Sequence, residues 1–169
     1  MNASLFSVTD PETITDNLFK LIGSDWMLIT AGVPESFNTM TASWGGMGVI
    51  WNKKVCFCVI RPTRHTRIFT ESADYFSLSF FEERYRDVLT YCGSHSGRDV
   101  DKVKETRLTP LFGDNIVYFA EARLVFVCRK IYYQDIDPRN FLDPAIDRNY
   151  PLKDYHRLYV GEIVSCLAK

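Results

Sequence analysis

Hydrophobic and polar positions along this chain predict a series of short β-strands. Compact or alternating runs rich in Val, Ile, Thr and aromatic residues are typical of strands. Glycines at positions 45, 46 and 48 are expected to interrupt the second of these strands, at residues 37–44. The pattern gives roughly six or seven strands, at residues 26–31, 37–44, 54–60, 75–81, 116–120, 122–133 and 155–167.

Short helices are predicted between some of these strands. One-sided apolar spacing, helix-forming residues and a following glycine indicate a helix. These signals occur at residues 15–22, 66–72, 82–91 and 99–105, whereas 138–150 is ambiguous because of its prolines and turn formers. Strands often follow one another without a regular β–helix–β alternation, which favours an antiparallel barrel over a doubly wound parallel sheet. We therefore expect a mainly β fold with short helices, as a single domain over residues 1–169.

Composition and charge limit the classes of partner that the chain is expected to bind. The 169 residues carry a net charge of −1 without a long run of one sign, so nothing indicates a nucleic-acid partner. The longest apolar stretches, such as residues 55–60, are too short to span a bilayer. Aromatic residues make up 14% of the chain, and they must pack in the core, at a subunit interface or against a flat ligand. Composition leaves these three alternatives open.

The cysteines and the start of the chain indicate a cytoplasmic protein. Five scattered cysteines, an odd number, are typical of reduced thiols rather than of a disulfide framework. Residues 1–9 lack the charged start and apolar run of a secretory signal. Cys56 and Cys58 lie two apart on a predicted strand, where we expect both to be small core residues. Neither Cys92 nor His95 has the spacing of a metal ligand, so no metal site is predicted.

The strongest local signal is the segment Arg61-Pro62-Thr63-Arg64-His65-Thr66-Arg67. It follows a predicted buried strand and opens a predicted helix. A phosphate there would meet backbone N–H groups, the positive end of the helix dipole, threonine hydroxyls and guanidinium groups. A solvated helix start with surface arginines explains the same residues equally well.

A second signal is the segment Asn38-Thr39-Met40-Thr41-Ala42-Ser43-Trp44-Gly45-Gly46. Its alternation places Thr39, Thr41 and Ser43 on one face of a strand. Small residues and glycines would let a flat ring approach the backbone. Taken alone, the segment favours a structural interpretation, namely an amphipathic edge strand with Trp44 in the core.

A third signal lies in residues 91–102, Tyr-Cys-Gly-Ser-His-Ser-Gly-Arg-Asp-Val-Asp-Lys. Ser96 or Gly97 could precede a helix whose first turn holds Asp99 and Asp101. The residues suit a mobile loop that brings Ser, His and Arg over a ligand. They suit a well-capped connection between two helices better.

Several common chemistries have no local support. The glycines at 45, 46 and 48 do not match the G-x-G-x-x-G dinucleotide fingerprint, and no Walker-type phosphate loop occurs. No Ser/His/Asp order and no pair of carboxylates stands out, so hydrolysis is not indicated. A nicotinamide nucleotide would therefore have to visit the site without a dedicated Rossmann domain.

Together these segments resemble the flavin reductase-like, FMN-binding split-barrel family, and within it the flavoredoxin-like members. Further matching segments are residues 19–23, 26–32 and 155–163. No single piece is specific, but their order and spacing are, and the resemblance covers nearly the whole chain.

The resemblance implies a homodimer with FMN near the subunit interface. It implies that the strand at residues 38–44 lines the flavin and that the arginine-threonine segment lies near the phosphate, with the 96–98 loop close to the cofactor. The implied FMN-binding residues are Asn38, Thr39, Met40, Thr41, Ala42, Ser43, Trp44, Arg61, Thr63, Arg64, Thr66, Ser96, Gly97 and Arg98. Because a flavin carries the redox chemistry itself, no side chain is predicted to be catalytic.

Three functions are consistent with this sequence. The first is an oxidoreductase in which NADH or NADPH reduces bound FMN, which then reduces another flavin or acceptor. The second is a flavoredoxin-like carrier that moves electrons between redox protein partners without turning over nicotinamide. The third is a β-barrel binding domain without a cofactor, which the order of the motifs disfavours.

Overall fold

The computed structural model describes residues 5–113 and 115–169 and shows a mainly β chain with short helices. Residues 1–4 and 114 lie outside the described residues, and with them the beginning of the predicted domain and of the segment inspected for a targeting signal. The strands are β1 (Ser7–Thr9), β2 (Met27–Val33), β3 (Ser36–Ala42), β4 (Gly45–Ile50), β5 (Lys53–Ile60), β6 (Tyr75–Phe80), β7 (Pro110–Gly113), β8 (Ile116–Phe119), β9 (Leu124–Asp135) and β10 (Arg157–Ala168).

The strands form one large antiparallel sheet that curls into a split barrel. Its order is β3-β2-β6-β9-β10-β5-β4, with β1 pairing with β10 off this path, whereas β7 and β8 form a separate pair. The two ends of the path, β3 and β4, follow each other in the chain across Ser43 and Trp44. The barrel is split there, and the predicted fold class is confirmed.

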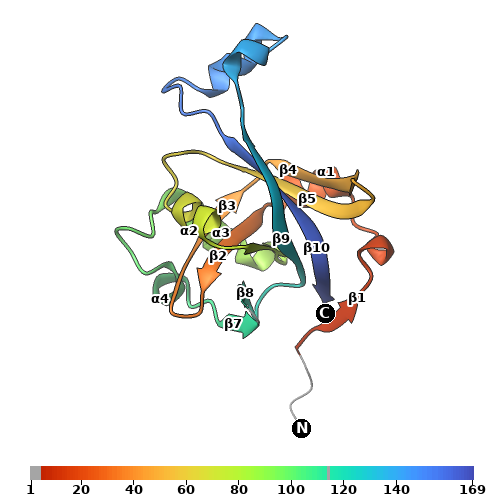
Figure 1. Cartoon of the computed structure of the whole chain (residues 1–169). Helices are drawn as coiled ribbons and strands as arrows, with labels where there is room; N and C mark the ends of the chain where they lie inside the picture. Colours follow the sequence, from red (N-terminus) through yellow and green to blue (C-terminus); the bar gives the residue numbers. More distant parts are fainter. Residues whose placement is uncertain (1–4, 114) are drawn as a thin grey trace.

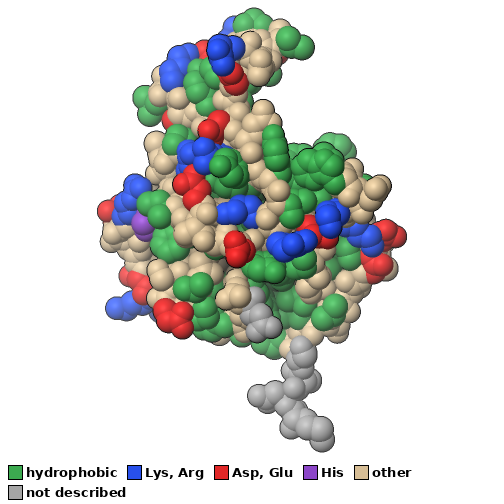
Figure 2. Space-filling model, viewed as in Figure 1, with side chains coloured by type: hydrophobic (Ala, Val, Ile, Leu, Met, Phe, Trp, Pro, Cys, Tyr) green, Lys and Arg blue, Asp and Glu red, His purple; other side chains and the backbone are tan. Residues whose placement is uncertain are grey.

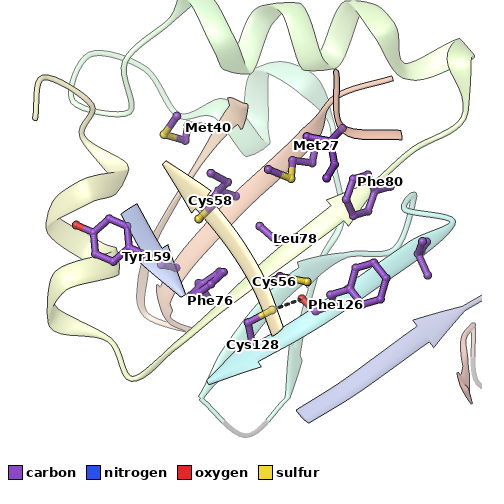
Figure 3. Packing of buried hydrophobic residues seen from close by; sticks show 14 of the residues in the cluster. Met27, Met40, Cys56, Cys58, Phe76, Leu78, Phe80, Phe126, Cys128 and Tyr159 are labelled. Carbon is purple, nitrogen blue, oxygen red and sulfur yellow. Dashed lines mark hydrogen bonds between the residues drawn. The ribbon is translucent and has the colours of Figure 1, made fainter. Parts of the chain in front are cut away.

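Apolar side chains fill the interior of the barrel. The core cluster draws residues from strands along the sheet path, and Figure 3 shows Met27, Cys58, Phe76, Phe126 and Tyr159 gathered around one centre. These side chains are at most 1% exposed. Cys56 and Cys58 are both fully buried, as predicted. Because the interior is filled, a ligand has to bind at the outside of the barrel or at its split.

Short helices cover the outside of the sheet, and one segment projects from it. A second core cluster packs under α3, α4 and the β7–β8 pair. Figure 1 shows residues 136–156 extending away from the barrel between β9 and β10, and we call this segment the arm. The α-helices are α1 (Leu18–Gly23), α2 (Thr66–Ser72), α3 (Arg86–Ser94) and α4 (Lys102–Thr106), and the 3-10 helices are η1 (Pro11–Thr13), η2 (Glu83–Tyr85), η3 (Pro138–Asn140) and η4 (Pro144–Asn149).

None of the helices in the described part of the chain has the length and hydrophobicity that a bilayer span requires.

The strand predicted at residues 37–44 ends at Ala42, before Gly45, Gly46 and Gly48, and these glycines form part of a further strand that was not predicted. These residues lie in β4, which pairs with β5 along its length. A Cβ at position 46 would lie 2.4 Å from Cζ of the Phe57 ring on the neighbouring strand. The glycine therefore makes room for an aromatic side chain. Strands β1 and β7 were also not predicted, since each has only a few residues.

Three predicted helices begin later than expected. Helix α1 starts at Leu18 because Asn17 is its N-cap, with Oδ1 accepting from the Lys20 amide at 3.1 Å. Helix α3 starts at Arg86, because residues 83–85 form a 3-10 turn. Helix α4 starts at Lys102 because Asp101 is its N-cap, with Oδ1 accepting from the Lys104 amide at 3.1 Å. Helix α2 has the predicted bounds, and the ambiguous region 138–150 contains η3 and η4.

Helix α2 is fixed to the barrel by charged groups. Glu71 accepts from Arg67 at 2.7 Å and from Arg157 of β10 at 3.0 Å. Lys130 of β9 donates to the carbonyl oxygens of Thr70 and Glu71, where α2 ends. Cations at a helix C-terminus are favourable because unpaired carbonyl groups gather there. These contacts set the position of the segment that precedes α2.

Candidate functional site

A small cavity, which we call the basic cavity, lies where three stretches of chain meet. Its volume is about 160 Å³. The stretches are β3, the segment that enters α2, and the loop between α3 and α4. The lining residues are Asn38, Thr63, Arg64, His65, Thr66, Gly93, Ser94, His95, Ser96, Gly97 and Lys102. The structure thus brings parts of all three sequence signals together.

Two cations in this cavity bind only backbone carbonyl groups. Arg64 Nη1 donates to the Gly93 oxygen at 2.9 Å, and Lys102 Nζ donates to the oxygens of Cys92 and Thr39 at 2.8 Å each. Lys102 is only 5% exposed, and its burial lowers its pKa to about 8. Burial also lowers the pKa of Arg64. Within residues 5–113 and 115–169 neither cation pairs with a carboxylate, so the cavity favours an anion.

A buried ring nitrogen faces the same surroundings without a partner. His65 Nδ1 is buried and makes no hydrogen bond. Burial, followed by the charges of Arg98 and Lys102, lowers the pKa of this histidine. Buried polar atoms normally have a partner, so an unpaired one beside two cations indicates that a ligand completes the site. A dianionic phosphate has the charge and the oxygen atoms that this donor set requires.

Gly97 allows the loop to close over β3. A Cβ at this position would lie 2.0 Å from Asn38 Oδ1. Asn38 is held in turn, because its Nδ2 donates to Thr66 Oγ1 at 2.8 Å. The loop between α3 and α4, strand β3 and the start of α2 therefore contact one another around the basic cavity.

A second, mainly apolar cavity of about 490 Å³ adjoins the first, and we call it the apolar cavity. It lies at the split between β3 and β4. Arg64, Gly93 and Ser94 line both cavities. The predicted residues that line it are Arg61, Arg64 and five from the second sequence signal, namely Met40, Thr41, Ala42, Ser43 and Trp44. Trp44 is 45% exposed, so the interpretation that placed it in the core is wrong, although β3 is an edge strand as expected.

One wall of the apolar cavity is a neutral histidine. The His156 ring lies 5.1 Å from the Trp44 ring, centroid to centroid. A hydrogen bond of 2.9 Å joins His156 Nδ1 to the Tyr150 hydroxyl on the arm. Burial lowers the pKa of His156 to about 4, so the ring is uncharged at neutral pH. The arm thereby fixes the orientation of a side chain in the cavity wall.

Three predicted site residues lie away from the cavities to which the resemblance assigns them. The Thr39 hydroxyl is buried and forms a hydrogen bond of 2.8 Å with Thr30 Oγ1. Arg61 lines the apolar cavity, but its guanidinium binds Asp154 of the arm at 2.8 Å. Arg98 borders a separate groove rather than the basic cavity.

Other lining residues were not predicted. Lys102 and His65 are in the basic cavity, and Trp26, Leu89 and His156 are in the apolar cavity. Lys102 ends a motif that the sequence singled out, but a lysine is normally solvated, so the sequence holds no sign that this one is buried. Leu89 and Trp26 follow the apolar pattern of core residues.

Comparison with protein families gives one match. The model described as the flavin reductase-like domain matches residues 19–169 of this chain. A search of curated proteins finds no match.

Solved structures with a similar fold come from several organisms. An FMN-binding protein from Thermus thermophilus, solved with p-hydroxybenzaldehyde, is 21% identical with a TM-score of 0.68, over 95% of this chain and 81% of that chain. A flavoredoxin from Methanosarcina acetivorans is 20% identical with a TM-score of 0.67, over 95% and 76%. Component B of nitrilotriacetate monooxygenase from Bacillus cereus is 15% identical with a TM-score of 0.64, over 94% and 79%. At these identities the likeness shows the fold alone.

Proposed function

This chain belongs to the flavin reductase-like domain family, and from that membership we propose that it binds FMN and uses NADH or NADPH to reduce flavin. One observation carries the proposal. A mainly apolar cavity shares lining residues with a small cavity that holds Arg64 and Lys102 without a carboxylate partner in the described chain. FMN has the matching shape, a flat ring at one end and a phosphate at the other.

The proposed phosphate ligands are the side chains of the basic cavity. Arg64 and Lys102 supply positive charge, and the hydroxyls of Thr63 and Thr66 supply further donors. The unpaired Nδ1 of His65 supports this assignment, because a bound phosphate oxygen would satisfy it. Among the predicted residues, Ser96 and Gly97 lie beside these groups and Arg61 does not.

The proposed ring site is the apolar cavity. Ala42 at the end of β3 and the adjoining Ser43 offer small side chains and backbone groups, Met40 adds an apolar surface, and Trp44 and His156 offer aromatic faces. Bound FMN would supply hydride and electron transfer, whereas the protein binds it, orients it and excludes water. His156 stays neutral at neutral pH because of its low pKa, so it adds no charge beside the ring. We assign no side chain a catalytic role.

A second function has one observation in its favour. The fold of the chain is similar to that of a flavoredoxin. Electron transfer between redox protein partners, without turnover of nicotinamide, is therefore the alternative that an experiment has to separate from the first.

We also propose that the chain is a homodimer in the cytoplasm. Support comes from two aromatic side chains on neighbouring parts of the sheet, Phe57 of β5 and Tyr132 of β9, which are 38% and 39% exposed on either side of the buried Val160 of β10. Trp51 packs against Tyr132 with ring centroids 5.7 Å apart and is 54% exposed. Figure 2 shows hydrophobic side chains gathered on the side where β4 and β5 lie. A contiguous apolar patch of this kind is typical of a subunit interface.

The visible spectrum of the FMN-loaded protein under anaerobic conditions tests the proposal. We expect a flavin band that stays with the protein through gel filtration and bleaches when NADH or NADPH is added. A retained band that bleaches only with a reduced ferredoxin-type donor would establish the carrier function instead. Failure to retain any flavin band would refute FMN binding. The variant Lys104→Met is the control, because Lys104 is exposed and lies in α4 outside both cavities. It should retain as much flavin through gel filtration as the wild type.

A further inference from the structure

The amine of Lys102 is held in the basic cavity with one position open. Its Nζ donates to the carbonyl oxygens of Cys92 on α3 and Thr39 on β3, at 2.8 Å each. A tetrahedral amine nitrogen has four positions, of which one is Cε and two point at these oxygens. Within residues 5–113 and 115–169 the fourth position has no hydrogen-bond partner, and Lys102 lines the cavity. The fourth position is therefore available to a ligand.

In the neutral amine this fourth position holds the lone pair. Both hydrogens are then donated to the carbonyl oxygens, so the electrons that can attack a carbonyl carbon are directed away from the protein groups. Burial and the charge of Arg64 lower the pKa of Lys102 to about 8, against the opposing effect of Cys92. At pH 7.5 about a quarter of this amine is neutral, compared with ~0.1% for a lysine of ordinary pKa. Desolvation beside a second cation is a known way to make a lysine nucleophilic.

An anion site adjoins this nucleophile. Arg64 Nη2 contacts the Cys92 oxygen at 3.4 Å, so the guanidinium and the amine of Lys102 are neighbours at one carbonyl group. Thr63 and Thr66 line the same cavity, whose volume of about 160 Å³ excludes long ligands. A small ligand that uses both groups has a phosphate for Arg64 and an electrophilic carbon for Lys102, with few atoms between them.

We propose that Lys102 forms a reversible imine with a short phosphorylated aldehyde. The amine nitrogen attacks the aldehyde carbon and a C–N bond forms. The aldehyde oxygen then leaves as water, together with the two hydrogens of the amine, so the step needs no oxidant or reductant. The phosphate stays on Arg64. The imine and FMN would exclude each other from the basic cavity; this competition rests on the proposed function, whereas imine formation does not.

Reductive trapping in the flavin-free protein tests the inference. Sodium cyanoborohydride at pH 7.5 converts an imine with D-glyceraldehyde 3-phosphate into a stable secondary amine, which peptide mass mapping locates. We expect one adduct per chain, on Lys102, formed at least about tenfold faster than with unphosphorylated glyceraldehyde. Inorganic phosphate and FMN should slow the reaction. Arg64→Ala should remove the preference for the phosphorylated aldehyde, whereas Lys104→Met, at an exposed position of α4, should leave the rate of trapping unchanged.

The outcomes separate this inference from the proposed function. Adducts that form on exposed lysines such as Lys20 and Lys104 as fast as on Lys102 would overturn the imine site, and so would equal rates for the two aldehydes. A protein that binds FMN and forms no adduct on Lys102 would overturn the inference and leave the proposed function standing. Selective trapping on Lys102 in a protein that binds no FMN would support the imine site and refute the proposed function.

Discussion

Replacing Lys102 by methionine should weaken FMN binding by about 10- to 150-fold and leave riboflavin binding nearly unchanged. A charge-assisted hydrogen bond to phosphate contributes about 1.5–3 kcal/mol, and ~1.4 kcal/mol corresponds to a factor of ten. Methionine keeps the length of the buried stem and removes only the ammonium group. Riboflavin lacks the phosphate, so it reports on the ring site alone. Lys104→Met, two residues along α4 and exposed, is the matched control.

The same lysine should make stability and binding depend on pH. Its pKa of about 8, against an ordinary value of 10.5, corresponds to a cost of about 3 kcal/mol in the flavin-free protein below pH 8, at ~1.4 kcal/mol per unit. As pH rises from 8 to 10.5 the folded protein loses this proton before the unfolded chain does, so this contribution to stability rises with pH. FMN affinity should fall over the same range, because the neutral amine no longer attracts the phosphate.

Isothermal titration with FMN and riboflavin at pH 7 and 9.5, together with urea unfolding at both pH values, measures these effects. Lys102→Met should abolish both pH dependences. An equal loss of affinity for FMN and riboflavin, or an FMN affinity of the wild type that is the same at pH 7 and 9.5, would refute a phosphate role for Lys102.

Three further substitutions test neighbouring parts of the structure. Arg64→Ala should weaken FMN binding by about 1.5–3 kcal/mol and riboflavin binding much less, as measured by fluorescence titration, and equal losses would remove Arg64 from the phosphate site. Tyr150→Phe should lower the unfolding free energy by about 1–3 kcal/mol in urea, because it leaves the buried Nδ1 of His156 without its partner, and an unchanged value would show that water replaces the hydroxyl. Glu71 has a pKa below its ordinary 4.5, chiefly through its hydrogen bond to Arg67. The stabilising effect of its charge should be present above pH 4.5 and be lost as the pH falls further. The melting temperatures of the wild type and Glu71→Gln should therefore converge in acid, and a difference that stays constant with pH would contradict this.

The sequence predicted elements well where a single local pattern decides the structure. Helix α2 begins and ends as predicted, and β5 and β6 differ from prediction by one residue at one end. Strand β4 was missed because its glycines are typical of turns, and only the ring of Phe57 on the neighbouring strand explains why they lie in a sheet. A contact between neighbouring strands cannot be predicted from the local pattern of hydrophobic and polar residues.

The sequence predicted which segments form the site, but not the contacts that individual side chains make within it. The sequence pointed to residues 38–46, 61–67 and 91–102, and the structure brings all three to adjoining cavities. The role of Arg61 could not be foreseen, because its partner Asp154 is 93 positions away on the arm. The burial of Lys102 depends likewise on the carbonyl oxygens of Thr39 and Cys92, which lie on other elements.

Titration of the purified, flavin-free protein with FMN, and in parallel with riboflavin, tests the central claim most directly. The account predicts saturable binding of one FMN per chain, with riboflavin binding at least about tenfold more weakly because the basic cavity stays empty of phosphate. Absence of FMN binding would contradict the proposed function. Equal affinity for the two flavins would contradict the assignment of the basic cavity to the phosphate.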